Sequence, residues 1–97
     1  MDKDFHVYIL ASKMGGTIYI GVTSDLVGRV YIHREALVPG FTSKYGVHRL
    51  VWFEQRGTAE SAITREKQLK KWNRAWKIEP IEKTNASWKD LYPTLFT

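Results

Sequence analysis

The chain has 97 residues, 43% of them hydrophobic and 13% aromatic, which excludes a disordered chain and predicts one folded domain over residues 1–97. The absence of cysteine excludes disulfides and thiolate metal ligands, and the three histidines show no zinc-binding spacing. A net charge of +5 favours polyanionic partners, nucleic acid before membrane. The longest apolar run is Leu50–Phe53 and the first residues are polar, so we expect no membrane segment and a cytoplasmic location.

Residues 5–12 (FHVYILAS) and 17–24 (TIYIGVTS) are rich in Val, Ile and Tyr, which predicts two strands. The glycines of KMGG between them allow a tight reversal, so the strands should form a hairpin. Residues 23–37 carry Leu26, Val30 and Leu37 at helical spacing, which predicts a helix capped by Thr23 or Ser24.

Residues 38–46 contain Pro39 and Gly40 and predict a loop, and the apolar centre of residues 47–55 predicts a third strand. A helix is expected over residues 60–72, capped by Thr58, and another over 74–83, interrupted near Pro80. The apolar tail, residues 85–96, should pack back on the domain. The order strand, strand, helix, strand, helix, helix predicts an α+β fold with a three-stranded, mainly antiparallel sheet flanked by helices.

Glu66 is a carboxylate within the apolar stripe of the helix over residues 60–72. One interpretation is a partly solvated ion pair with Lys70, one turn away. The other is a ligand for a divalent ion such as Mg²⁺, which often takes only one or two protein carboxylates. This helix alone favours the ion pair.

Two further pairs have both a structural and a functional interpretation. Arg29 and His33 lie one turn apart beside an apolar stripe, where they could pack at the rim of the core or bind a phosphate and move a proton. Trp72 and Trp76, also one turn apart, could stack on bases, but their spacing favours core packing.

The chain resembles the GIY-YIG nuclease superfamily, specifically its small single-domain bacterial members. The residues that carry the resemblance are, in order, Tyr8, Tyr19 to Gly21, Arg29, His33, Lys44 and Glu66. The resemblance covers almost the whole chain and is strongest in TIYIGVTSDLVGRVYIHR, GFTSKYG and REKQLKKW. In the first triplet, VYI, His6 and Val7 stand where the family name leads one to expect a glycine, but Tyr8 is kept. The resemblance implies a three-stranded antiparallel sheet with flanking helices and metal-dependent hydrolysis of DNA phosphodiester bonds.

The resemblance also implies the roles of individual residues. Tyr8 would orient or deprotonate the attacking water, and Tyr19 would donate a hydrogen bond to the phosphate or share the proton network. A phenol is mostly neutral at pH 7, so a tyrosine base needs nearby cations such as Arg29, Lys44 or the metal. The implied catalytic residues are Tyr8, Tyr19, Arg29, His33 and Lys44, the substrate-binding residues are Gly21 and Asn85, and the ligand for Mg²⁺ or Mn²⁺ is Glu66.

The sequence therefore favours a DNA endonuclease acting on branched or damaged DNA in repair or recombination. Two alternatives stay open: a nucleic-acid-binding domain that keeps the fold without catalysis, and a module that binds a protein partner in DNA processing. A binding domain would not require a lone carboxylate at Glu66 on an apolar helix face, which favours the enzyme. The sequence gives no oligomeric state.

Overall fold

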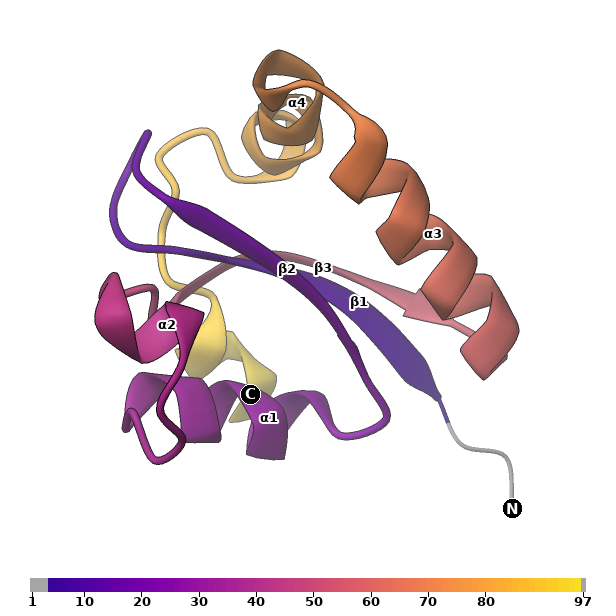
Figure 1. Ribbon diagram of the computed structural model, residues 1–97. Coiled ribbons are helices and arrows are strands. Elements are labelled where there is room, and N and C mark those ends of the chain that lie inside the picture. Colours follow the sequence, from indigo (N-terminus) through magenta and orange to yellow (C-terminus); the bar gives the residue numbers. More distant parts are fainter. Residues whose placement is uncertain (1–3, 97) are drawn as a thin grey trace.

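The computed structural model describes residues 4–96, which form a three-stranded sheet covered on both faces by helices (Figure 1). The strands are β1 (Phe5–Ala11), β2 (Ile18–Thr23) and β3 (Arg49–Arg56), and their order across the sheet is β2-β1-β3. Both pairings are antiparallel, and Tyr8 on the central strand lies opposite Gly21 on β2. The predicted α+β fold with an antiparallel three-stranded sheet is confirmed.

Helices cover the sheet in two layers. One layer consists of α3 (Ala59–Lys71) and α4 (Arg74–Thr84), and the other of α1 (Leu26–Arg34), α2 (Phe41–Lys44) and the 3₁₀ helix η1 (Tyr92–Phe96) (Figure 1). None of the helices in residues 4–96 is long and apolar enough to span a membrane.

The central strand has no polar face because both of its faces are covered. Val7 and Ile9 are fully buried in the core beneath α3 and α4, whereas Tyr8 and Leu10 are buried in the core shared with α1. Successive side chains of a strand point to opposite faces, so the continuous run VYILA fills both cores. The register thereby directs the hydroxyl-bearing ring of Tyr8 toward the α1 layer.

Several predicted boundaries differ from the structure. The cap of α1 is Asp25, whose carboxylate accepts a hydrogen bond from the backbone N–H of Gly28, whereas Thr23 bonds the backbone of Asp25. This helix ends at Arg34, because the chain turns at Ala36, which has a φ of 51°. The segment predicted as a loop contains the short helix α2. The predicted cap of α3, Thr58, is confirmed by its hydrogen bond from the N–H of Ser61.

Helix α4 runs through Pro80, so the predicted interruption is wrong. Proline removes one backbone hydrogen-bond donor, but both ends of this helix are stabilised by other hydrogen bonds. The side chain of Asn73 caps its start, and the N–H of Asn85 donates to the carbonyl of Ile81 at its end. Ile81, directly after the proline, is fully buried, and its packing favours a continuous helix.

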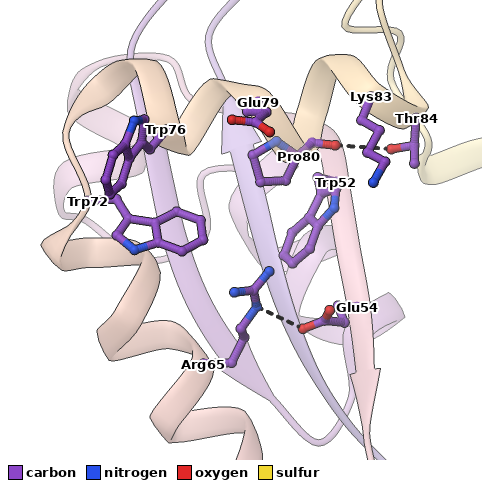
Figure 2. Close-up of a pocket in the computed structure, with 9 residues that line it drawn as sticks. All are labelled: Trp52, Glu54, Arg65, Trp72, Trp76, Glu79, Pro80, Lys83 and Thr84. Atoms are coloured by element: carbon purple, nitrogen blue, oxygen red, sulfur yellow. Dashed lines mark hydrogen bonds and ion pairs between the residues drawn. The ribbon is translucent and has the colours of Figure 1, made fainter.

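The prediction that Trp72 and Trp76 belong to the core is correct only for Trp72, which is partly buried against the core under α3 and α4. Trp76 is 56% exposed. The two rings meet edge to face, with their centroids 6.1 Å apart, at one side of a cavity (Figure 2). Their helical spacing correctly predicts that the two rings meet, but it does not predict whether another element covers them.

The tail packs back on the domain, as predicted, by passing along β3 to the α1 layer. Trp88 is buried under α4, and the backbone N–H of Leu91 donates to the carbonyl of Leu50 at 2.7 Å. The carboxylate of Asp90 accepts from the N–H of Leu50 and pairs with Arg34 on α1. The tail is thus bonded to both β3 and α1.

Candidate active site

Three aromatic side chains from separate elements meet on the α1 side of the sheet. The ring centroids of Tyr8 and Tyr19 are 6.3 Å apart, and the ring of His33 lies 6.1 Å from Tyr8 and 5.4 Å from Tyr19. The tyrosines share a sheet face because Tyr19 is paired with Leu10, two residues after Tyr8 on β1. The hairpin register therefore produces the tyrosine pair, and α1 adds the histidine.

Gly21 leaves the space that the Tyr8 ring occupies. A Cβ atom at residue 21 would lie 2.5 Å from the Tyr8 hydroxyl oxygen and 2.6 Å from its Cζ, far inside van der Waals contact. Since Tyr8 is only 1% exposed, its ring has little freedom to move away. Gly21 therefore makes room for Tyr8, and its contact with a substrate stays a prediction.

His33 is bonded at both ring nitrogens. Nε2 lies 3.3 Å from the Tyr8 hydroxyl, and Nδ1 lies 2.8 Å from the hydroxyl of Thr42 on α2. Burial, followed by the positive charges of Arg29 and His48, lowers the pKa of His33 below its usual value, which favours the neutral ring at pH 7. In the tautomer protonated at Nδ1, the ring donates to Thr42 and accepts from Tyr8.

Tyr8 is a neutral phenol in this environment. Burial first, and then Tyr19 and Glu66, raise the pKa of Tyr8 above its ordinary value, while Arg29 acts to lower it. The sequence-based expectation was that nearby cations would favour ionisation, but burial has the larger effect here. An unassisted phenolate is therefore excluded as the resting state, and the hydroxyl can ionise only as its proton passes to another group.

Arg29 and Glu66 belong to helices of opposite layers, and the charge of each influences Tyr8. Arg29 is exposed on α1, whereas Glu66, on α3, has a side chain that is 20% exposed. The Glu66 carboxylate lies 3.4 Å from the Nζ of Lys70, so the predicted i,i+4 ion pair is present. Both charges affect the pKa of Tyr8, which places them within electrostatic reach of its hydroxyl.

A cavity of about 360 Å³ along β2 joins the two layers. Its walls come from Tyr19 on β2, Phe41 on α2, Lys70 on α3 and Lys77 on α4. A smaller hollow of about 170 Å³, enclosed by residues 38–42, opens beside Tyr19 and His33. The two hollows share Tyr19 and Phe41 as lining residues, and Lys70 and Lys77 give the larger one, which we call the channel, its positive charge.

The donor set around Glu66 fits a hydrated divalent ion but not a cage made of protein ligands. Within residues 4–96 there is no cluster of three or more His, Cys, Asp or Glu side chains that could hold a metal. Mg²⁺ commonly binds one or two carboxylates and completes its octahedron with water and phosphate oxygens. Glu66, which is half-buried and raises the pKa of Tyr8 by its charge, could supply such a carboxylate if Lys70 moved aside.

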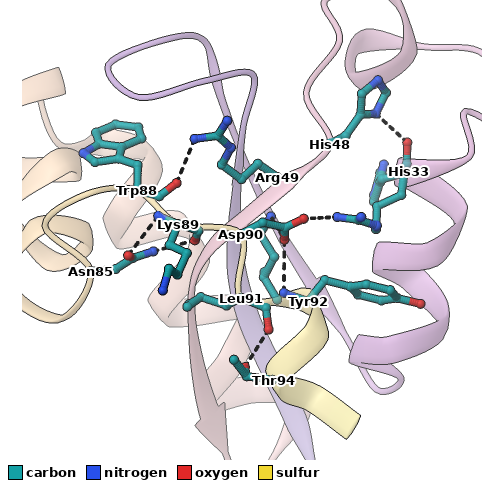
Figure 3. Close-up of polar contacts among 12 residues, drawn as sticks. His33, His48, Arg49, Asn85, Trp88, Lys89, Asp90, Leu91, Tyr92 and Thr94 are labelled. Atoms are coloured by element: carbon teal, nitrogen blue, oxygen red, sulfur yellow. Dashed lines mark hydrogen bonds and ion pairs between the residues drawn. The ribbon is translucent and has the colours of Figure 1, made fainter.

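Two of the predicted site residues contact groups outside the cluster of Tyr8, Tyr19 and His33. The ammonium of Lys44 is 5.4 Å from the centre of the Tyr45 ring on the exposed side of α2. Asn85 is buried in the other layer, where its amide donates to the carbonyls of Val51 and Lys89 and its oxygen accepts from the N–H of Lys89 (Figure 3). Since three backbone groups occupy this side chain, Asn85 holds the tail in place, and its assignment to substrate is not supported.

Sequence analysis missed three residues around His33. The hydroxyl of Thr42 bonds Nδ1 of His33, and the ring centroid of Phe41 lies 6.2 Å from that of Tyr19. The Nδ1 of His48 bonds the backbone carbonyl of His33 at 2.8 Å (Figure 3). Two of these are in the motif GFTSKYG, which carried part of the resemblance. That motif pointed to the correct segment, although Lys44 was chosen from it in place of Thr42.

Comparison with known families and structures identifies the family and the fold of this chain. Residues 4–79 match the family model of the GIY-YIG catalytic domain. The chain is also similar to the UPF0213 protein BH0048 from Bacillus halodurans, whose structure was solved in solution by NMR: the identity is 25%, the TM-score is 0.56, and the match covers 90% of this chain and 92% of that one. A search of curated proteins found no match.

Proposed function

Because this chain belongs to the GIY-YIG catalytic-domain family, and so to a nuclease superfamily, we propose that it is a metal-dependent endonuclease that hydrolyses phosphodiester bonds in branched or damaged DNA. The observation that carries the proposal is the cluster of Tyr8, Tyr19 and His33, with Arg29 and Glu66 in electrostatic reach of one phenol. This arrangement combines a proton relay with a cation and a carboxylate that both act on the same phenol.

In the proposed mechanism, Tyr8 orients the attacking water and acts as a relay. The water gives a proton to the Tyr8 oxygen while the Tyr8 proton moves to Nε2 of His33, 3.3 Å away. The water oxygen bonds to phosphorus, and the bond from phosphorus to the leaving oxygen breaks. The relay lets a phenol of raised pKa act without becoming a free phenolate, and it requires a neutral His33, which the lowered pKa favours.

The remaining residues of the cluster position the phosphate. Arg29 presents a guanidinium to the phosphate oxygens, where negative charge builds up in the transition state. Tyr19 donates a hydrogen bond from the wall of the channel, and Lys70 and Lys77 contact the neighbouring phosphates of the strand. Glu66 would hold Mg²⁺ or Mn²⁺, which when bound supplies Lewis-acid stabilisation of the leaving oxygen.

The decisive experiment compares the wild type with the Glu66→Gln and Glu60→Gln variants on labelled duplex, flap, fork and four-way-junction DNA, with Mg²⁺, Mn²⁺ or EDTA. Glu60 is an exposed residue on the same helix and serves as the matched control. We expect metal-dependent cleavage by the wild type and Glu60→Gln and none by Glu66→Gln. The preferred substrate will identify the DNA structure recognised.

A second variant separates catalysis from binding. Tyr8→Phe removes only the hydroxyl, so it should cleave poorly while binding DNA as the wild type does. Wild-type cleavage by Tyr8→Phe would overturn the relay. Salt-sensitive DNA binding without cleavage by any variant would favour a non-catalytic binding domain instead.

A further inference from the structure

A second cavity lies on the opposite side of the sheet from the tyrosine pair. It has a volume of about 550 Å³ and is formed by β3, α3 and α4 (Figure 2). Three indole rings line it, with Trp72 and Trp76 along one side and Trp52 across from them (Figure 2). We call it the tryptophan cavity, and its size is in the range of cavities that bind small ligands.

The chain itself already supplies a cation to this cavity. The guanidinium of Arg65 lies 5.3 Å from the centre of the Trp72 ring and 6.0 Å from that of Trp52. It is held by Glu54, whose carboxylate accepts from Nε of Arg65 at 3.1 Å and also pairs with Arg56. A cationic ligand would therefore be repelled by Arg65. Glu54 is already paired, and the other lining carboxylate, Glu79, is balanced by the lining cation Lys83, so the cavity has no net charge to attract a cation.

The ligand chemistry that remains is a planar, uncharged ring with polar edges. Trp76 is 56% exposed, so its surface is open for stacking, and aromatic rings prefer offset or edge-to-face contact with indole. Arg65 and Glu54 at one end and Glu79 and Lys83 on α4 provide donors and acceptors for ring substituents. A nucleobase has this shape and this hydrogen-bonding capacity.

Basic side chains lie between this cavity and the channel along β2. Lys77 lines the channel beside Tyr19, and its neighbour in sequence, Trp76, lines the tryptophan cavity. Lys70 also lines the channel, and exposed Lys71 and Arg74 lie at the corner between α3 and α4. A single strand that leaves the tyrosine pair past Lys77 would reach Trp76 with its phosphates next to basic side chains.

We propose that the tryptophan cavity binds an unpaired base of the DNA strand, as a second contact remote from the site of cleavage. This inference rests on the proposed function for the identity of the ligand as DNA. It implies a preference for substrates with a single-stranded segment, because a base within a duplex cannot enter the cavity.

The test is a binding experiment in EDTA, which does not depend on cleavage. Hexathymidylate and an abasic strand of equal length are titrated into the protein, and the indole Nε1–H signals are followed by NMR. We expect the signals of Trp72 and Trp76 to shift with hexathymidylate and to move much less with the abasic strand.

Two variants and a control make the test specific. Trp76→Ala should weaken binding of hexathymidylate about ten-fold or more, Trp76→Phe should keep most of the affinity, and Tyr31→Ala, which removes an exposed aromatic ring from α1, should bind normally. Equal binding of both strands, or unchanged affinity in Trp76→Ala, would overturn the proposal even if the protein cleaves DNA. Shifts caused by a neutral aromatic peptide but not by hexathymidylate would also overturn it and would indicate a protein ligand.

Discussion

The ring of Tyr8 lies across the Cα of Gly21, its antiparallel partner on β2, so that a Cβ there would be 2.6 Å from the ring carbon Cζ. We expect Gly21→Ala to displace this ring from His33 and to lower the free energy of unfolding by about 1–3 kcal/mol, a typical cost of overpacking. Chemical denaturation and single-turnover cleavage measure the two effects.

The control for this substitution is Gly57→Ala, because a Cβ on Gly57 meets no atom within 4 Å in the described part of the chain. That variant should keep normal stability and activity. A Gly21→Ala protein with wild-type stability and cleavage would show that Tyr8 can move without consequence.

His33 should make stability depend on pH. Its pKa is lowered in the folded protein by burial, Arg29 and His48, whereas the unfolded chain binds a proton at the ordinary value of about 6.5. Unfolding therefore takes up a proton in acid, and the free energy of unfolding should decrease as the pH falls below about 6.5. Urea unfolding between pH 7.5 and 5.5 should show a weaker pH dependence in His33→Asn than in the wild type.

The same titration should appear in catalysis. Once Nε2 of His33 carries a proton, it can no longer accept the proton of Tyr8, so the cleavage rate should decrease with falling pH in the acid range. A rate that stays constant down to pH 5, in protein shown to be folded, would contradict the relay.

Arg29 and Lys70 should differ in their contribution to cleavage. Arg29→Ala removes the guanidinium proposed to stabilise the transition state and should lower the single-turnover rate about 100-fold, as for other transition-state donors. Lys70 is 52% exposed and paired with Glu66. Because an exposed ion pair contributes only about 1 kcal/mol or less, Lys70→Ala should lower the rate less than about ten-fold. Equal losses in the two variants would count against the role of Arg29.

Asn85 should matter for stability and not for DNA. Asn85→Ala leaves the carbonyl of Val51 and the backbone of Lys89 without their buried partner, which should cost about 1–3 kcal/mol of unfolding free energy. DNA affinity and cleavage per folded molecule should stay unchanged when measured at a temperature where the variant is fully folded. Weakened DNA binding at unchanged stability would restore the substrate-binding assignment.

Local patterns determined most of the fold. The Tyr, Ile and Val runs and the intervening glycines predicted the hairpin, and Thr58 with the apolar stripe predicted α3, because these features act over a few residues. The proximity of Tyr8 and Tyr19 also follows from the hairpin register. The errors arose where packing overrides local preference: Pro80 stays within a helix whose next residue is buried.

The site was predictable where it depends on one hairpin and one helix, and less so where distant segments meet. Thr42 reaches His33 only through the path of the chain around α2, and Asn85 finds its acceptor on β3 34 residues earlier in the sequence. Neither contact leaves a periodic signal in the sequence. The chemical roles of the clustered residues stay predictions until the variants are measured.

The bonds between the tail and Leu50 also cover part of an edge of the sheet. β3 lies at one side of the sheet, and a free strand there offers unpaired backbone groups to a strand of a second molecule. The N–H and carbonyl of Leu50 are occupied by Asp90 and Leu91, so the tail blocks strand addition at this position. Loosening the segment around Asp90 and Leu91 would expose apolar surface and the unpaired backbone groups of Leu50, and we expect such a change to promote aggregation.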